Sequence, residues 1–361
     1  MLKFTVFADL HYKKRMYAAS VEHLRTIFDR ANAHGSEIVL SLGDFCNDFR
    51  ESPEIVNEFL NNSYGLPVYN VYGNHELETM GNVMELVTPL LTNRPVNWGN
   101  GVSDGSVGYY WFDTGEYRFI ALDTNYSYNP DTEEWEHNRE GSWGPPGYAG
   151  IEGNNLYPNS LGPVQLEWLS DILHRSAEEK KSCILLSHAV LTARIRAHIH
   201  EVRAVERLID EVNSIRSGTV LMCLNGHRHT DTFLVRNNVV YFDVNVVLSG
   251  AWKENKEFHY LDGQGFEFTD YDENGNKLSV EHMDYNSLRQ GSNTWFFDAP
   301  LSANITLDGN KLTIEGSCCN WAFGVEPDLD VFDADIASGV VPKISSHTYV
   351  FPCGAEGDKK C

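Results

Sequence analysis

The chain of 361 residues is 42% hydrophobic and has no internal repeat or low-complexity tract, so it can bury the core of a sizeable domain with an appendage. Its 28 Lys and Arg against 51 Asp and Glu give a net charge of −23. This charge argues against a protein that binds nucleic acid by neutralising its phosphates, although such a charge often serves solubility alone. No apolar stretch could cross a bilayer and the first strand follows Met1 directly, so we expect a cytoplasmic protein, with export after loss of a leader as the alternative.

Apolar, β-branched runs of the strand type recur along the chain, and each stops one or two residues before a polar residue. In chain order the segments are FTVFADLH, IVLSLGDF, VYNVYGNHE, CILLSHA and VLMCLNGHRH. Helical spacing occurs between them, at Leu24, Ile27, Phe28 and Ala31 and again at Val205, Leu208, Ile209 and Val212. Alternating strands and helices predict right-handed crossovers and partly parallel sheets, in which the loops after the strands gather at one rim.

The polar residues at that predicted rim are of types that bind metal ions: Asp9, His11, Asp44, Asn74, His75, His188, His227 and His229. A carboxylate such as Asp44 can bridge two ions while other donors complete each coordination sphere. Mixed Asp, His and Asn donors without thiolate suit Mn, Fe or Zn better than Mg or Ca. Any one of these residues alone is more often a turn or hydrogen-bonded structural residue. Together, in this order, they predict a site for two divalent transition-metal ions.

The chain resembles the calcineurin-like metallophosphoesterases over residues 1 to about 245, on the motifs Asp9-Leu10-His11, Gly43-Asp44, Gly73-Asn74-His75-Glu76, His188 and Gly226-His227-Arg228-His229. The resemblance implies an α/β fold, a four-layer αββα sandwich of two mixed sheets flanked by helices. It also implies two sets of metal ligands, namely Asp9, His11, Asp44 and His229 for one ion and Asp44, Asn74, His188 and His227 for the other. His75 would be no ligand, but a general acid or a cationic stabiliser of the phosphoryl oxygens.

The activity expected from this resemblance is hydrolysis of a small phosphate ester of the phosphodiester, cyclic-nucleotide or nucleotide-diphosphate type. Two dications offset by two carboxylates would bind a phosphate, lower the pKa of a bridging water and hold the hydroxide in line with the leaving group. His75 would then protonate the departing oxygen, because imidazole ionises near neutrality. The expected partner is thus a small phosphorylated substrate, with neither nucleic acid nor membrane.

Departures from the family's subgroups narrow this expectation. No Tyr stands three residues after Asp44, which argues against the purple acid phosphatases. Tyr12 and residues 47–50 do not reproduce the motifs of the protein Ser/Thr phosphatases. The alternatives are a phosphomonoesterase or protein phosphatase, a metal-dependent nuclease, and a scaffold that keeps the fold without the activity. The acidity and the absence of basic clusters argue against the nuclease.

Residues 124–162 are too long and too rich in Asn, Gly, Pro and aromatic residues to be a simple connection. They follow the strand FIALDT, so we predict a wall or lid whose rings, including Tyr126 and Trp143, stack on the organic part of the substrate. Packing of the rings on the core explains the same composition equally well. Arg194 and Arg196, which follow His188, are further candidates for contact with a phosphate oxygen. Such a run is more often a solvated segment at the entrance to a helix.

Beyond Asp243 the pattern changes to strand and turn, and we expect residues 246–316 to be mostly β. The pairs Asn237-Asn238, Asn274-Gly275 and Asp308-Gly309 have the composition of hairpin turns. We divide the chain into a catalytic domain, residues 1–290, and a β-rich C-terminal extension, residues 291–361. Of the seven cysteines, Cys46, Cys183 and Cys223 are expected in the core as reduced thiols, while one bridge among the later four stays open.

Overall fold

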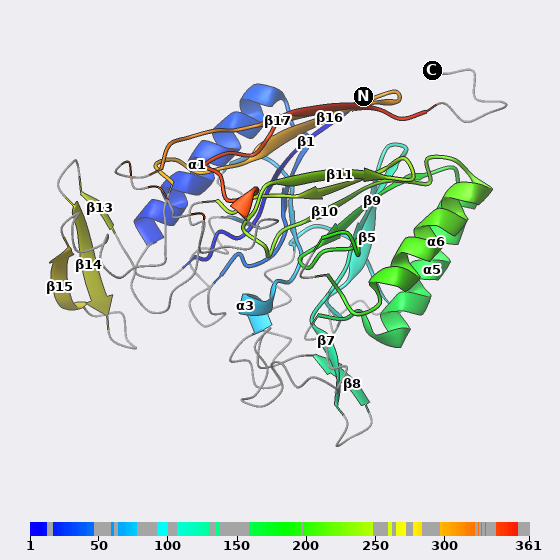
Figure 1. The fold of residues 1–361 in the computed structure, drawn as a ribbon, viewed down its shortest axis with the longest axis horizontal. Helices are drawn as coiled ribbons and strands as arrows, with labels where there is room; N and C mark the ends of the chain where they lie inside the picture. Colours follow the sequence, from blue (N-terminus) through cyan, green and yellow to red (C-terminus); the bar gives the residue numbers. More distant parts are fainter. Residues whose placement is uncertain are drawn as a thin grey trace.

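The computed structural model shows two large β-sheets with helices on their outer sides (Figure 1). Its description covers residues 1–12, 17–46, 59–60, 64–77, 92–99, 107–129, 134–137, 159–195, 198–247, 259–261, 265–271, 277–283, 297–321, 324, 326, 329 and 337–352.

The first sheet has six strands in the order β18-β17-β16-β1-β2-β3. They are β1 (Leu2–Phe7), β2 (Ile38–Ser41), β3 (Val68–Asn70), β16 (Ala303–Asp308), β17 (Lys311–Gly316) and β18 (His347–Val350). β1, β2 and β3 run parallel, as their sequence pattern predicts, whereas β16, β17 and β18 pair antiparallel. The carboxyl ends of β1, β2 and β3 therefore lie at one edge.

Helix α1 (Tyr17–His34) packs on β1 and β16 of this sheet. Its predicted apolar face is fully buried, at Leu24, Ile27, Phe28 and Ala31. The face is continuous because residues three and four apart lie on the same side of an α-helix.

The second sheet has seven strands in the order β11-β12-β10-β9-β6-β5-β4. They are β4 (Asn97–Trp98), β5 (Tyr110–Thr114), β6 (Tyr117–Ala121), β9 (Ser182–Ser187), β10 (Val220–Asn225), β11 (Thr232–Arg236) and β12 (Val239–Asp243). β6, β9, β10 and β12 run parallel. Helices α5 (Gly162–Glu178) and α6 (Val202–Ile215) cover the outer face through a second apolar cluster. α6 carries the predicted buried face, and α5 is not among the predicted helices.

The main core lies between the two sheets. Phe4 of the first sheet contacts Phe119 of the second edge to face, with ring centroids 5.4 Å apart, and Phe119 stacks on Phe112 at 5.0 Å. Strands β2 and β10 are buried along their whole length, as expected for strands covered on both faces. The layers therefore follow the order helix, sheet, sheet, helices, and the predicted four-layer αββα sandwich is confirmed.

Smaller elements project from the sandwich. β7 (Tyr126–Asn129) and β8 (Glu134–His137) form a hairpin at the same end of the molecule as the short helix α3 (Asn74–Leu77), and β13 (His259–Leu261), β14 (Gly265–Tyr271) and β15 (Lys277–Met283) form a separate small sheet (Figure 1). The predicted turn at Asn237-Asn238 joins β11 to β12, with φ of 49° and 63° at its two residues. Asp308-Gly309 begins the turn from β16 to β17. Asn274-Gly275 lies outside the described residues.

The end of the chain is β-rich, as predicted, and its strands belong to the first sheet. β16 pairs antiparallel with β1 from Leu2↔Leu307 to Val6↔Ala303, so β1 is an interior strand of that sheet. The division at residue 290 stays a prediction. Cys46, Cys183 and Cys223 are buried free thiols as expected, and Cys318 and Cys319 are also unbridged. No helix in the described part of the chain is long and apolar enough to span a bilayer.

Candidate metal centre

The candidate ligands lie where the carboxyl ends of the parallel strands of the two sheets meet. Asp9 and His11 follow β1, Asp44 follows β2, and His188 and His227 follow β9 and β10 of the second sheet. Backbone hydrogen bonds from Asp9 N to Gly43 O (3.1 Å) and from His11 N to Asp44 O (2.8 Å) hold the first two loops together. The His227 N–H donates to the Asp9 carboxylate at 3.1 Å, which joins the loops of the two sheets.

Left-handed backbone conformations are concentrated in these loops. Positive φ occurs at Asp9 (56°), His11 (49°), Asp44 (48°), His227 (73°) and His229 (54°). Non-glycine residues adopt this region rarely and at a cost, and they persist only where the surrounding structure imposes it. Such strain at five candidate ligands indicates that the loops are shaped to aim side chains at a common point.

Two glycines allow the loops after β2 and β3 to approach each other closely. Gly43 has φ of 92°, and a Cβ on it would lie 2.7 Å from both Gly73 N and His188 Nδ1. A Cβ on Gly73 would lie only 2.1 Å from Asp44 Oδ1. Any larger residue would therefore push the Asp44 loop away from the Asn74 loop.

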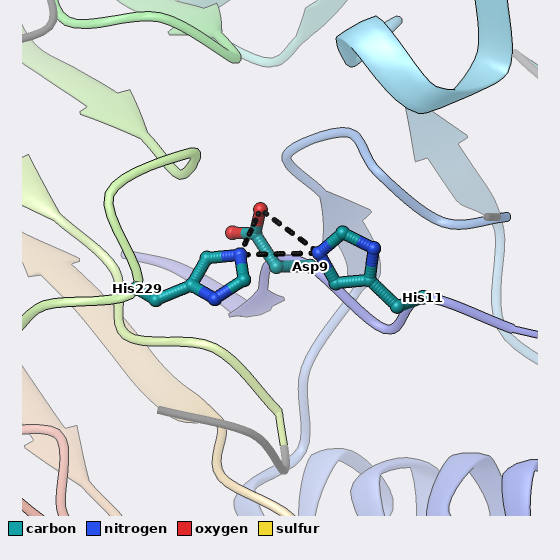
Figure 2. Close-up of side chains that lie close together, drawn as sticks. All are labelled: Asp9, His11 and His229. Carbon is teal, nitrogen blue, oxygen red and sulfur yellow. Dashed lines mark hydrogen bonds and ion pairs between the residues drawn. The ribbon is translucent and has the colours of Figure 1, made fainter. Parts of the chain in front are cut away.

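The first donor group comprises Asp9, His11 and His229, whose side chains point toward one another from the segments after β1 and β10 (Figure 2). His11 Nε2 lies 3.1 Å from His229 Nε2 and 4.0 Å from Asp9 Oδ1, and His229 Nε2 lies 3.3 Å from Asp9 Oδ1. Donor atoms each about 2.1 Å from one ion lie roughly 3 Å from one another. These three atoms therefore fit a shared divalent cation.

The second donor group comprises Asp44, His188 and His227. His188 Nε2 lies 3.1 Å from Asp44 Oδ2 and 3.1 Å from His227 Nδ1. The amide oxygen of Asn74 is 3.2 Å from the same His188 nitrogen. His188 Nδ1 donates to Leu42 O at 2.8 Å, which fixes the ring and leaves Nε2 facing the other donors. This group also fits one divalent cation.

The two donor groups adjoin at Asp44. Its Oδ2 lies 3.1 Å from His188 Nε2 in the second group and 3.8 Å from His11 Nε2 in the first. One carboxylate thus faces both groups, as a bridging ligand of a two-metal site must.

His75 lies beside this junction on α3. Its backbone N–H donates to Asp44 Oδ1 at 2.9 Å, and its ring meets the His11 ring edge to face with centroids 4.8 Å apart. Its ring nitrogens come close enough to Asp44 and His11 to complete a third donor group. The structure therefore puts His75 next to members of both donor groups. This position is compatible with a general acid that binds no metal and also with a metal ligand.

Electrostatics couple Asp44 and His188. Burial raises the pKa of the Asp44 carboxyl, but His188, His75 and His11 outweigh burial and hold that pKa well below its ordinary value. Burial lowers the pKa of His188, but the Asp44 charge outweighs it and raises the pKa to about 10. Burial and the neighbouring His188 lower the pKa of His227 to about 3. Since a cation beside Asp44 and a proton on His188 compensate the same charge, metal binding and protonation compete here.

Glu76 is a residue whose role the sequence reasoning did not identify. It is fully buried, and its carboxylate accepts hydrogen bonds from Gly73 N (2.6 Å), Asp44 N (3.0 Å) and Cys46 N (2.9 Å). Burial and the Asp44 charge raise the pKa of Glu76 to about 7. Glu76 therefore ties the loops after β2 and β3. A usable signal was present, because Glu three residues after Gly73 matches the return half of a helix capping box.

The structure describes only some of the residues predicted to contact the substrate. Trp143 and Arg196 lie outside the described residues. Tyr126 begins β7 and is partly buried, and burial and the Asp123 charge raise its pKa. Arg194 is exposed in the turn between β9 and α6. In the hairpin, a Cβ added at Gly162 would lie 3.5 Å from the Trp135 ring, and Trp135 is 36% exposed. The lid and the arginine contacts stay predictions.

Comparisons with known proteins agree with this geometry. A family model described as "Calcineurin-like phosphoesterase" matches residues 2–231. An Arabidopsis thaliana protein named "Manganese-dependent ADP-ribose/CDP-alcohol diphosphatase" is 25% identical over 278 residues, 67% of this chain and 84% of that protein. The crystal structure of a dimetal phosphatase from Danio rerio has the same fold, with a TM-score of 0.58 at 15% identity, covering 97% of this chain and 99% of that one. Because the family match spans well over half of the sequence, this chain belongs to the calcineurin-like phosphoesterases, hydrolases that act on phosphoric ester bonds.

Proposed function

We propose that this chain is a manganese-dependent hydrolase of small nucleoside diphosphate esters, of the ADP-ribose or CDP-alcohol class, with two divalent ions bound at adjacent sites. The observation that carries the proposal is the meeting of the two donor groups at Asp44, 3.1 Å from one histidine donor and 3.8 Å from another. The proposed ligands are Asp9, His11, Asp44 and His229 for one ion and Asp44, Asn74, His188 and His227 for the other.

The chain's own residues prepare the pocket for a phosphate. The ions, when bound, supply Lewis acidity and lower the pKa of bound water. Asp44, Asp9 and the histidines fix their positions, and most of these side chains are buried, which strengthens each charge interaction by excluding water. His75, in the short helix α3, can hold a proton beside the leaving oxygen.

Manganese is the proposed ion because the donor set mixes carboxylate, imidazole and amide oxygen, a set that suits Mn, Fe and Zn. The name of the Arabidopsis relative points to manganese among these. That name also points to a diphosphate flanked by a nucleoside and a second organic group. A net charge of −23 supports a small substrate over a polynucleotide, since local cations suffice for one diphosphate.

A substrate panel tests the proposal. We expect the purified protein with manganese chloride to hydrolyse ADP-ribose and CDP-choline faster than cyclic nucleotides, bis(p-nitrophenyl) phosphate, sugar phosphates or single-stranded DNA. Chelation by EDTA should abolish activity, and manganese should restore it. Asp44→Asn should lower kcat by about 100-fold or more, because loss of a partner that only orients a ligand already costs about 10- to 100-fold. Asp210→Asn, which breaks an ion pair between α6 and Arg236 at the end of β11, is the matched control and should retain activity.

Preference for single-stranded DNA would instead assign a nuclease, and preference for sugar phosphates a phosphomonoesterase. A folded wild-type protein that binds no manganese and hydrolyses none of these esters would refute the proposal.

A further inference from the structure

The loop between β10 and β11 carries two of the proposed ligands, His227 and His229, in left-handed conformations. A loop with this backbone needs support, because relaxation of either residue would turn its ring away from the donor group. The support comes from residues before, between and after the two histidines.

Three side chains, one at the end of β10 and two in this loop, converge on one buried carboxylate, that of Asp243 at the end of β12. Asn225, two residues before His227, donates from Nδ2 to Asp243 Oδ1 at 2.7 Å. Arg228 Nη1, between the two histidines, donates to Oδ2 at 3.3 Å, and the Thr230 hydroxyl, just after His229, donates to Oδ2 at 3.0 Å. Asp243 is 0% exposed and the Arg228 side chain 6% exposed, so water does not compete with these bonds.

The position of Asp243 in the sheet makes this support rigid. β12 lies between β10 and β11, and Asp243 is the register partner of Asn225 on β10 and of Thr232 on β11. The carboxylate therefore sits on the strand flanked by both ends of the loop. Burial raises the pKa of the Asp243 carboxyl, and the Arg228 guanidinium is the cation that opposes the rise.

We propose that Asp243 is a positioning residue that sets the directions of His227 and His229, and that the Arg228 guanidinium completes it by donating a hydrogen bond to the buried carboxyl. This inference rests on the proposed two-metal site. Asp243 touches no reacting atom, and it acts by holding the side chains of Asn225, Arg228 and Thr230 in place.

Conservative variants with a matched control test this. Asp243→Asn removes one acceptor and the charge, and Arg228→Lys keeps the charge but loses the planar guanidinium. The control pair is Asp210→Asn and Arg236→Lys, from the ion pair at 2.6 Å between α6 and the end of β11, away from the histidines. Each full-length protein is titrated with manganese chloride by calorimetry, its bound Mn(II) is examined by electron paramagnetic resonance, and its metal-free unfolding temperature is measured.

We expect Asp243→Asn and Arg228→Lys to weaken manganese binding by about 10- to 100-fold, the usual effect of losing a partner that orients ligands. Their Mn(II) spectra should lose the signature of two coupled ions. The control variants should keep both properties, even where their unfolding temperatures fall as much. If Asp243→Asn does not fold, Arg228→Lys decides.

Wild-type affinity and an unchanged coupled spectrum in a folded Arg228→Lys protein would overturn the inference and leave the proposed function standing. A wild-type protein that binds no manganese would overturn both.

Discussion

Asp44 shows how a single residue can be both costly and necessary. Its carboxylate is almost fully buried, which opposes its charge, and its backbone adopts a left-handed conformation, which adds strain. It is stabilised by the His75 N–H on one oxygen and the His188 imidazole near the other. This combination has no benefit for the stability of the fold alone, because an apolar residue would fill the same space at lower cost. The environment fits the proposed role of Asp44 as a ligand of cations.

His75 provides a test at the level of the chemical step. We expect His75→Ala to lower kcat by about 100-fold or more toward an ester with a poor leaving group, because a positioned acid contributes on that scale. The loss should be much smaller with a p-nitrophenyl ester, whose leaving group departs without protonation. Steady-state assays with both esters check this, with His174→Ala on α5 as the control. An equal loss with the two esters would show that His75 acts as a ligand or a charge stabiliser instead.

Gly73 provides a test of the close approach of the two loops. We expect Gly73→Ala to weaken manganese binding and to destabilise the protein by about 1–3 kcal/mol, because the new methyl would overlap Asp44. Gly115→Ala is the control, since its methyl meets open space and only the positive φ opposes it. Calorimetry and thermal unfolding measure the two effects. Unchanged manganese affinity in a folded Gly73→Ala protein would contradict the expectation.

Each helix packs through one apolar face. Histidines beside that face in α1 and α5 make the stability of the protein depend on pH. His23 of α1 is largely enclosed, and burial lowers its pKa to about 4 from the ordinary 6.5. His174 of α5 is exposed, and the Ser170 carbonyl and Glu211 raise its pKa. The folded state therefore disfavours a proton on the first histidine and favours one on the second.

These opposite shifts predict opposite pH trends. Below about pH 6.5 the unfolded chain protonates His23 while the folded chain does not, so stability falls as pH falls toward 4. Relative to His23→Gln, the wild type should lose about 2 kcal/mol of unfolding free energy between pH 7 and pH 5. Relative to His174→Gln, the wild type should be most stable below pH 6.5 and lose that advantage as pH rises. Urea unfolding at both pH values checks this, and parallel trends for the two variants would contradict it.

Strands from the first and the last parts of the chain pair with each other in the first sheet. β1 pairs with β16 on one side and β2 on the other, and Thr5 on β1 donates to Asn304 on β16 at 2.7 Å. The segment after β17 also contacts residues close to the candidate metal centre. The Asp231 carboxylate, two residues after His229, accepts the Ser345 N–H at 3.1 Å, and Asn245 donates to Val341 O at 2.7 Å. The C-terminal part of the chain therefore stabilises both the first sheet and the candidate centre.

This arrangement predicts that residues 1–290 do not fold on their own. Their β1 would become an edge strand with unpaired backbone groups and an uncovered core. A milder variant, Ile305→Ala, should cost about 2–5 kcal/mol, because Ile305 is fully buried beside Phe4. Thr313→Ala, on β17, is the control. Circular dichroism and cooperative unfolding report the outcome, and a stable, manganese-binding fragment of residues 1–290 would show that the predicted division is a true domain boundary.

The sequence by itself determined the strands that end in polar residues, the buried faces of α1 and α6, the hairpin at Asn237-Asn238 and the set of candidate ligands. These are local signals, because side-chain periodicity and turn chemistry act over a few residues. Only the tertiary structure decided that Glu76 and Asp243 collect hydrogen bonds from neighbouring loops, and that β16 joins β1. Those relations depend on the pairing of segments far apart in the chain, and burial of a charge becomes acceptable only when distant donors meet it.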